Sequence, residues 1–404
     1  TLPSFSFTRW PEIHYGAGVT KGLKTSLADD LKDVLWVTGG NNGKFSAYFE
    51  KFLLNFDAEM TDNRIVRIGQ EPSPQLIDAI CDQFRKSGIR KVVGVGGGSV
   101  IDAAKAISAM LVTDDSLFDY LEGVGKGIPL SGEKIYFVAV PTTSGTGSEM
   151  TANAVFSEVG EQGYKKSIRH KNLVPDEIWI DPELMTTCPP LQTVCSGLDA
   201  FTQLLEPYLS TKANPITDTL AEKGLQLIVD NIEQAFGDGR DNTDIRGSLA
   251  LAAAFSGTCL ANAGLGIVHG LAGPLGGFFE IPHGVACAGL VAKANEMNQR
   301  ALQLRGEPIY LRKMATVGQM FHSGMDEIKP ISIGDKLDKT TLETNCQRLT
   351  DNLMRWESLF GLPKFSKYGI AENDIPKLIK VASNRNNPIE LNSDEIASIL
   401  RHCI

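Results

Sequence analysis

Short apolar runs and helix-like segments alternate along the first 140 residues of the chain. Four apolar runs have the length and composition of strands, at residues 33–38, 64–68, 91–96 and 135–140. Three helix candidates lie between them, at residues 45–55, 72–87 and 102–111. Strands that alternate with helices at this spacing indicate right-handed crossover connections and a parallel sheet. The pattern therefore predicts an α/β domain whose sheet is covered by helices on both faces.

After about Pro182 the pattern changes to helices, and strand candidates are largely absent. The clearest helix candidates are residues 194–209, 217–236, 245–265, 307–324, 375–382 and 393–401. The sequence Cys188-Pro-Pro190 is a natural break near this change. We predict two domains, an α/β domain at residues 1–184 and an all-α domain at residues 185–404.

The stretch from Gly247 to Phe279 is long and apolar enough to pass a crude test for a membrane span. It is, however, rich in Ala, Gly and Ser, carries Thr258 and Asn262, and is broken by glycines and Pro274. These features favour a helix buried inside the helical domain, where small side chains let neighbouring helices approach closely.

Composition restricts the class of protein. The chain has 404 residues, of which 42% are hydrophobic and 22% charged, as in a soluble protein with two sizeable cores. A net charge of −9 and an isoelectric point of about 5.3 argue against a nucleic-acid or anionic-membrane partner. The chain has seven cysteines, an odd number, and no Cys-x-x-Cys motif. The first residues lack the pattern of a signal peptide. We expect reduced thiols and a cytoplasmic protein.

Two glycine-rich turns follow predicted strands. Val95-Gly-Gly-Gly-Ser-Val-Ile-Asp-Ala-Ala-Lys105 opens a helix, where free N–H groups favour an anion, although the same sequence also suits a plain strand-to-helix turn. The second turn, Pro141-Thr-Thr-Ser-Gly-Thr-Gly-Ser-Glu149, is unusually rich in hydroxyl groups. Ligands of parallel sheets bind beyond the carboxyl ends of the strands. Two such turns at one edge of the sheet favour a shared, phosphate-bearing ligand.

The helical half holds a second candidate site. His269 and His283 are fourteen positions apart, and each is followed by glycine. Asp199 and Gln203 are four apart on a predicted helix and so share one of its faces. If the two pairs meet, one carboxylate, one amide oxygen and two imidazoles suit a divalent metal such as Fe²⁺ or Zn²⁺. Such a metal stabilises an alkoxide and polarises a carbonyl, as hydride transfer to or from carbon requires.

With these motifs the chain resembles the iron-dependent (group III) alcohol dehydrogenases, relatives of glycerol dehydrogenase and dehydroquinate synthase. The resemblance covers nearly the whole chain. Beyond the two glycine-rich turns it rests on Pro175-Asp-Glu-Ile-Trp-Ile-Asp-Pro182, Gly197-Leu-Asp-Ala200, Gly264-Leu-Gly-Ile-Val-His-Gly270 and Pro282-His-Gly284. It implies a Rossmann-like dinucleotide-binding domain, a helical domain and NAD(P)-linked oxidoreduction between them. It also implies a small alcohol or aldehyde as substrate and a homodimer.

The resemblance assigns roles to individual residues. It implies that Asp199, His269 and His283 are catalytic and hold the metal, with Gln203 at the position of the fourth ligand. It implies cofactor contacts at Gly39, Gly40, Asn41, Gly97, Gly98, Ser99, Asp102, Thr142, Thr143, Ser144, Asn153, Lys166 and Leu184.

The chain departs from the family pattern at three places. The fourth metal ligand is normally a histidine, but residue 203 is glutamine, whose neutral amide is a weaker donor. A further histidine, often assigned to proton relay in relatives, is Gly273 here, which leaves space in the pocket. The turn Thr38-Gly-Gly-Asn-Asn-Gly-Lys44 lacks the acidic residue of NAD-preferring relatives. Since Asn41, Asn42 or Lys44 could contact a 2′-phosphate, this turn favours NADP over NAD.

Three functions are compatible with these residues. The first is a metal-assisted NAD(P)-dependent alcohol dehydrogenase or aldehyde reductase. The second keeps the fold and the redox chemistry without the metal, or acts on a sugar, sugar acid or other polyol. The third is a lyase like dehydroquinate synthase, which recycles its cofactor.

Overall fold

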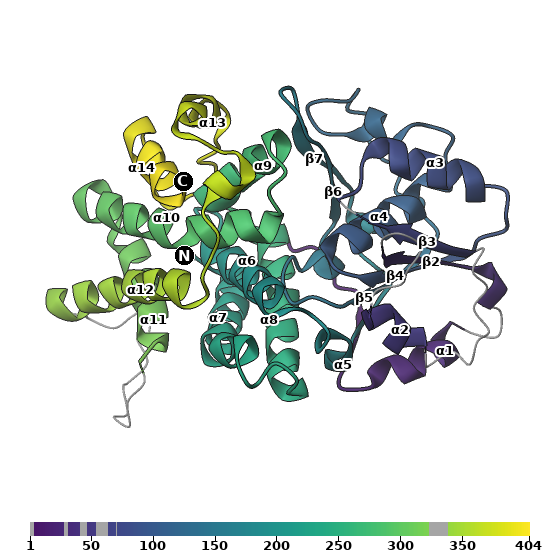
Figure 1. Ribbon diagram of the computed structural model, residues 1–404, viewed down its shortest axis with the longest axis horizontal. Helices are drawn as coiled ribbons and strands as arrows, with labels where there is room; N and C mark the ends of the chain where they lie inside the picture. The colour runs from purple at the N-terminus through teal and green to yellow at the C-terminus, as the bar shows by residue number, and fades with distance from the viewer. Residues whose placement is uncertain (1–3, 28–30, 41–46, 54–63, 70, 323–337) are drawn as a thin grey trace.

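The computed structural model of the chain describes residues 4–27, 31–40, 47–53, 64–69, 71–322 and 338–404. These residues form an α/β half and a helical half that lie side by side (Figure 1). The strands are β1 (Glu12–Tyr15), β2 (Val34–Gly39), β3 (Ile65–Ile68), β4 (Lys91–Gly96), β5 (Tyr136–Pro141), β6 (Asn153–Glu158), β7 (Tyr164–Arg169) and β8 (Glu177–Ile180).

Six strands form one parallel sheet in the order β1-β8-β5-β4-β2-β3. The predicted parallel sheet is confirmed, and the four predicted strands correspond to β2, β3, β4 and β5. The chain passes from β2 outward to β3 and then returns past β2 to β4, so the direction of winding reverses between β2 and β4. Crevices at such a reversal are where open α/β sheets bind ligands.

Four strands have no counterpart in the predicted set. β1 is an edge strand with mostly exposed side chains, so it lacks an apolar run. β6 and β7 form a separate antiparallel hairpin of alternating burial rather than a continuous hydrophobic segment. β8 is only four residues long, although all four are buried.

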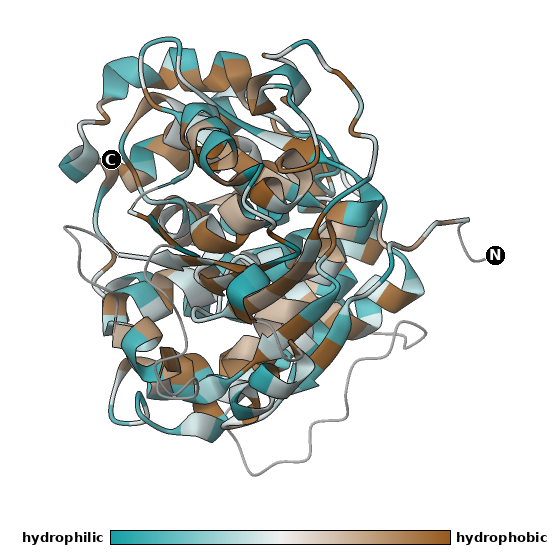
Figure 2. Cartoon of the chain, turned by 90° about the vertical axis from the view of Figure 1, so that its right-hand side faces the viewer, coloured by the Kyte–Doolittle hydropathy of each residue, from teal (hydrophilic) through white to brown (hydrophobic). Residues whose placement is uncertain are grey.

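Helices cover both faces of the sheet, as predicted. The helices of this half are α1 (Leu23–Ser26), α2 (Ala47–Leu53), α3 (Pro74–Phe84), α4 (Gly98–Met110) and α5 (Pro182–Met185). One core joins α3 and α4 to the sheet through Ile77, Ile107 and Phe137, and another joins α1, α2 and α5 to the opposite face through Val93 and Val95. Figure 2 faces this half and shows hydrophobic segments along the central strands.

The second half is helical. Its helices are α6 (Pro190–Tyr208), α7 (Pro215–Phe236), α8 (Thr243–Ala263), α9 (Ile267–Phe278), α10 (His283–Arg305), α11 (Pro308–Met320), α12 (Lys339–Leu359), α13 (Ile375–Val381) and α14 (Ser393–Cys403). Short 3₁₀ helices complete the described chain: η1 (Val19–Gly22), η2 (Leu31–Asp33), η4 (Leu117–Tyr120), η5 (Ser148–Met150), η6 (Lys171–Leu173), η7 (Phe365–Tyr368) and η8 (Glu372–Asp374). Six of these α-helices match predicted ones, whereas α9, α10 and α12 were not predicted. α10 is buried around most of its surface, so its sequence carries no one-sided apolar stripe.

The apolar stretch from Gly247 to Phe279 is not one buried helix but two. α8 ends at Gly264, which has a φ of 73° in the left-handed region that glycine adopts without strain. The chain bends by 99° between α8 and α9. Among the described residues no single helix is long and apolar enough to cross a membrane, and only this bent pair passes the length and composition test.

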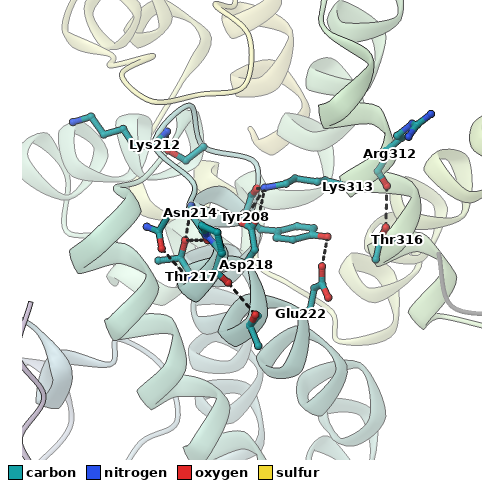
Figure 3. Close-up of polar contacts among 12 residues, drawn as sticks. Tyr208, Lys212, Asn214, Thr217, Asp218, Glu222, Arg312, Lys313 and Thr316 are labelled. Atoms are coloured by element: carbon teal, nitrogen blue, oxygen red, sulfur yellow. Dashed lines mark hydrogen bonds and ion pairs between the residues drawn. The ribbon is translucent and has the colours of Figure 1, made fainter. Parts of the chain in front are cut away.

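A buried polar network fixes the end of α6 against α7 and α11 (Figure 3). Lys313 Nζ donates hydrogen bonds to the carbonyl oxygen of Tyr208 at 2.7 Å and to both carboxylate oxygens of Asp218 at 2.8 and 2.9 Å. The Tyr208 hydroxyl donates to Glu222 at 2.6 Å. Because α6 also carries Asp199 and Gln203, this network helps to hold the predicted metal-binding helix in place.

Candidate cofactor and metal site

The two glycine-rich turns meet at the carboxyl edge of the sheet. α4 begins at Gly98, and its N-terminal N–H groups have no side-chain cap. A Cβ atom at Gly98 would lie 2.6 Å from Thr146 Cγ2, and one at Gly97 would lie 3.2 Å from Thr143 Oγ1. Glycine is therefore required at residue 98 for the close approach of the second turn. The uncapped start of α4, with Ser99 in its first turn, presents free N–H groups, which favour an anion.

The Asp102 carboxylate on α4 is hydrogen-bonded to the second glycine-rich turn and to β6. Its carboxylate accepts hydrogen bonds from the Ser148 hydroxyl and, at 2.9 Å, from the backbone N–H of Val155. Lys105, also on α4, donates to the carbonyl oxygens of Ser148, Thr151 and Asn153 at 2.8, 3.0 and 2.7 Å. Burial lowers the pKa of Lys105 to about 8. Both side chains hold the second turn and β6 against α4, and the cofactor contact of Asp102 stays a prediction.

The other residues predicted to contact the cofactor lie around this edge. Thr142 Oγ1 and Asn153 Oδ1 are buried and have no hydrogen-bond partner in the part of the chain that the structure describes, so they are available to a ligand. The Ser144 hydroxyl lies 3.3 Å from Met185 Sδ. Gly39 is the last residue of β2 and Gly40 follows it, and the Gly39 N–H donates to the Tyr48 hydroxyl at 3.0 Å. Leu184 is buried in the core beneath β4 and β5, and Asn41 lies outside the described residues.

Lys165 and Lys166 are neighbours on β7, and it is Lys165 that points toward the helical half. Lys166 is exposed on β7, whereas the Lys165 side chain is nearly buried and forms an ion pair with Glu71. A Cβ atom at Gly276 on α9 would lie 3.3 Å from Lys165 Cδ. The alternation of side chains along a strand explains the difference, since neighbouring residues face opposite sides. The cofactor contact of Lys166 stays a prediction.

Asp199, His269 and His283 converge from three helices. Asp199 lies in the middle of α6 and is buried, His269 lies in the first turn of α9, and His283 is the first residue of α10. Asp199 Oδ1 is 3.3 Å from His269 Nε2 and 3.7 Å from His283 Nε2. Among the described residues, neither Asp199 Oδ1 nor Oε1 of the neighbouring Gln203 has a hydrogen-bond partner of regular geometry, so Asp199 Oδ1 meets His269 only in the looser contact of an ion pair. The structure thus brings together the side chains that the sequence singled out, with unsatisfied oxygen atoms among them.

Glu206 orients His269. It lies seven residues after Asp199 on α6, and its Oε2 atom is 2.7 Å from His269 Nδ1. Its other oxygen accepts a hydrogen bond from the Val268 N–H at 2.7 Å, at the start of α9. With Nδ1 engaged in this way, Nε2 of His269 is the nitrogen directed at Asp199. Metal-binding histidines are commonly oriented by a carboxylate in this manner.

The electrostatics of the cluster favour a carboxylate at Asp199. Burial opposes its ionisation, but the electrostatic effect of the neighbouring imidazoles and the hydrogen bonds from His269 and Gln203 outweigh burial and hold the pKa of Asp199 below its usual value. Burial lowers the pKa of His283 to about 4, so that its imidazole is neutral at pH 7. Against the effect of burial, Cys287, Glu206 and Asp199 raise the pKa of His269 well above its usual value, so His269 and Asp199 form an ion pair. A metal binds the neutral imidazole and would displace the proton of His269.

Known protein families match both halves of the chain. The family "Iron-containing alcohol dehydrogenase" matches residues 11–182, and "Fe-containing alcohol dehydrogenase family, C-terminal" matches residues 193–404. The chain belongs to the iron-containing alcohol dehydrogenase family. It is therefore an oxidoreductase that acts on an alcohol or on the corresponding carbonyl compound, and its family uses NAD(P) and iron.

Individual relatives within the iron-containing alcohol dehydrogenase family resemble the chain over nearly its full length. Alcohol dehydrogenase 4 of Schizosaccharomyces pombe is 33% identical over 99% of this chain and 87% of its own. The NADPH-dependent butanol dehydrogenase of Clostridium saccharobutylicum is 27% identical over 97% and 96%. A crystal structure of 1,3-propanediol oxidoreductase superposes with a TM-score of 0.81 and 26% identity, covering all of both chains.

One side chain of the cluster was not predicted from the sequence. Cys287, one helical turn after His283 on α10, is fully buried, and its Sγ lies 3.7 Å from Nε2 of His269 and of His283. The sequence does contain a signal, because His283 and Cys287 are four positions apart and share a helix face. It was missed because all seven cysteines were assigned together as reduced thiols.

Proposed function

We propose that this iron-containing alcohol dehydrogenase transfers hydride between a nicotinamide dinucleotide and a primary alcohol or aldehyde, with a divalent metal bound by Asp199, His269 and His283. The observation that carries the proposal is the buried Asp199 Oδ1, which lies between two imidazole nitrogens at 3.3 and 3.7 Å and accepts no hydrogen bond of regular geometry from the described residues. A carboxylate oxygen left unsatisfied in the interior is costly unless a cation occupies the space beside it. The donor set fits Fe²⁺ or Zn²⁺.

Each group at the site has a proposed task. The N–H groups of Gly98 and Ser99 bind the cofactor pyrophosphate at the start of α4. Thr142 and Asn153 supply buried polar atoms that orient the rest of the cofactor. When bound, the metal acts as a Lewis acid that stabilises the alkoxide oxygen of the substrate. Glu206 holds His269 in the tautomer that leaves Nε2 free.

Gly273 supports a second substrate class. A Cβ atom at this position would have no atom within 4 Å, so the site has open space on the side of α9. Without a side chain at residue 273, the proton of the alcohol passes to water, to the substrate or to another side chain. The space also favours a sugar, sugar acid or other polyol as the alternative substrate.

The proposed cofactor preference and assembly rest on other observations. The turn after β2 has no carboxylate to repel a 2′-phosphate, which favours NADP, although Asn41, Asn42 and Lys44 lie outside the described residues. The ratio of kcat/KM with NADPH to that with NADH tests this preference.

We also propose a homodimer. Edge strand β1 exposes Ile13 and Tyr15, which makes it suited to contact a second copy.

Metal removal and restoration test the central proposal. Chelation is expected to abolish net NAD(P)H formation from a panel of alcohols, and Fe²⁺ or Zn²⁺ is expected to restore it. Asp199→Ala is expected not to recover when metal is added. Full activity in protein free of metal by elemental analysis would support the metal-free reductase instead. If no alcohol in the panel gave net cofactor reduction, the lyase would become the better alternative.

A further inference from the structure

Cys287 lies inside the cluster that we propose as the metal site. Its Sγ atom, Asp199 Oδ1 and the Nε2 atoms of His269 and His283 all lie within 4.8 Å of one another. Asp199 is on α6, His269 on α9, and both His283 and Cys287 are on α10. The four donor atoms therefore surround a common point from three helices.

The spacing of these atoms matches a tetrahedral metal site. Four of the six distances among them are 3.3, 3.7, 3.7 and 3.7 Å. Metal–ligand bonds of about 2.0–2.3 Å in tetrahedral geometry separate neighbouring donors by about 3.3–3.8 Å. The side chains would therefore need little rearrangement to bind an ion at their centre.

Buried polar atoms support a cation site independently of these distances. Asp199 and Gln203 are each at least nine-tenths buried, and neither Asp199 Oδ1 nor Gln203 Oε1 has a hydrogen-bond partner among the described residues. The ion pair with His269 at 3.3 Å leaves Asp199 Oδ1 without a hydrogen bond of regular geometry. A divalent cation would satisfy the carboxylate and would also be neutralised by two negative donors.

We propose that Cys287 binds the metal as a thiolate and takes the place of the imidazole that residue 203 lacks. This inference rests on the metal site proposed above. Binding forms a metal–sulfur bond and releases the thiol proton to solvent. Gln203 then remains beside Asp199 as a neutral neighbour.

A thiolate changes which metal is preferred. Thiolates are soft ligands that suit Zn²⁺, whereas carboxylate and imidazole alone discriminate less between Zn²⁺ and Fe²⁺. We therefore expect this chain to bind Zn²⁺ in preference to Fe²⁺. Cys287→Ser is expected to lower the Zn²⁺ affinity by at least about tenfold, with a smaller change in Fe²⁺ affinity, as measured by competition with a chromogenic chelator.

Cobalt substitution tests the metal–sulfur bond without an activity measurement. Co²⁺ added to metal-free protein is expected to give visible d–d bands and an intense near-ultraviolet thiolate-to-cobalt charge-transfer band. Cys287→Ser and Cys287→Ala are both expected to lose the charge-transfer band and keep the d–d bands. The matched control is Cys195→Ser, a buried thiol one helical turn before Asp199, which should keep both. Far-ultraviolet circular dichroism establishes that each variant is folded.

The outcomes separate the role of Cys287 from the metal site itself. Stoichiometric cobalt with d–d bands but no charge-transfer band in the unaltered protein would overturn the role of Cys287 and leave the metal site standing. A charge-transfer band that persists in both Cys287 variants would overturn it too. Failure of the unaltered protein to bind cobalt would overturn both proposals.

Discussion

Oε2 of Glu206 lies 2.7 Å from Nδ1 of His269, while Oε1 of the same carboxylate accepts a hydrogen bond from the Val268 N–H. One side chain of α6 thus orients a candidate metal ligand and also satisfies an N–H group at the start of α9. Gly266, which precedes α9, has no side chain to cap it. A Cβ atom at Gly266 would lie 3.1 Å from Glu206 Oε1, so glycine there lets the carboxylate reach the helix.

The double role of Glu206 predicts different effects for two substitutions. Glu206→Ala removes both contacts and is expected to lower the free energy of unfolding by about 1–3 kcal/mol, because the Val268 N–H loses its buried acceptor. Glu206→Gln keeps one amide oxygen and should cost less stability. Both are expected to weaken Zn²⁺ binding by about 10–100-fold, since His269 loses its carboxylate partner. Urea unfolding and chelator competition measure the two effects. Unchanged Zn²⁺ affinity in both variants would contradict the orienting role.

Two glycines of α9 predict different responses to alanine. At Gly273 an added Cβ meets no atom within 4 Å outside the adjoining residues and the helix backbone. Its gain in helix propensity is opposed by Pro274, which crowds the Cβ of the residue before it, so Gly273→Ala is expected to change the free energy of unfolding by less than about 1 kcal/mol. At Gly270 the same Cβ would lie 2.0 Å from the carbonyl oxygen of Ser383, so Gly270→Ala should destabilise the protein by more than Gly273→Ala does. Thermal unfolding of the two variants side by side checks this order.

The space at Gly273 also predicts a change in substrate range. Gly273→Leu is expected to lower kcat/KM for large or branched alcohols more than for ethanol, because the side chain fills the open space. Gly273→Ala is the control, because it adds only one methyl group to the same position. An equal loss for small and large alcohols would show that this space does not receive the substrate.

Glu149 predicts a fall in stability between acid and neutral pH. Burial raises the pKa of Glu149 from 4.5 to about 7 in the folded protein. Between these values the folded state holds a proton that the unfolded state has released, so the free energy of unfolding decreases as pH rises. Glu149→Gln should remove this decrease, which we expect to be about 1–3 kcal/mol between pH 5 and 7.5. The opposing effect of Lys105, whose pKa is lowered to about 8, acts at higher pH.

Urea unfolding at the two pH values measures the Glu149 effect. The matched control is Glu133→Gln, since Glu133 is exposed. The control should keep the pH dependence of the unaltered protein. The same dependence in Glu149→Gln would mean that other groups cause it.

The Lys313 network predicts strong coupling between two charged side chains. Lys313→Met leaves the carboxylate of Asp218 without its cation in a mostly buried setting, and we expect a loss of about 3–5 kcal/mol in the free energy of unfolding. The double variant Lys313→Met, Asp218→Asn should be less destabilised than the sum of the two single variants. Denaturant unfolding of all four proteins measures this coupling, and strict additivity would contradict it.

Much of the α/β half could be predicted because the pattern of apolar residues in its strands reflects how deeply each strand is buried. β2, β4 and β5 are continuous apolar runs covered on both faces, so their sequences identify them. β1 and the β6–β7 hairpin could not be predicted in this way, since their strands are partly exposed and are defined by their pairing. α10 was not predicted for the opposite reason. Because it is buried around most of its surface, its apolar residues do not recur with the helical period.

The sequence by itself determined the family motifs, the two glycine-rich turns and the identity of Asp199, His269 and His283 as candidates. Only the tertiary structure decided that Asp102 joins two turns, that Lys165 rather than Lys166 faces α9, and that Cys287 lies within the cluster of donors. The physical reason is that periodicity describes the environment of one segment along its own axis. Which side chains meet depends on how α6, α9 and α10 pack, and that packing is set by contacts between residues as far apart in sequence as Glu206 and His269.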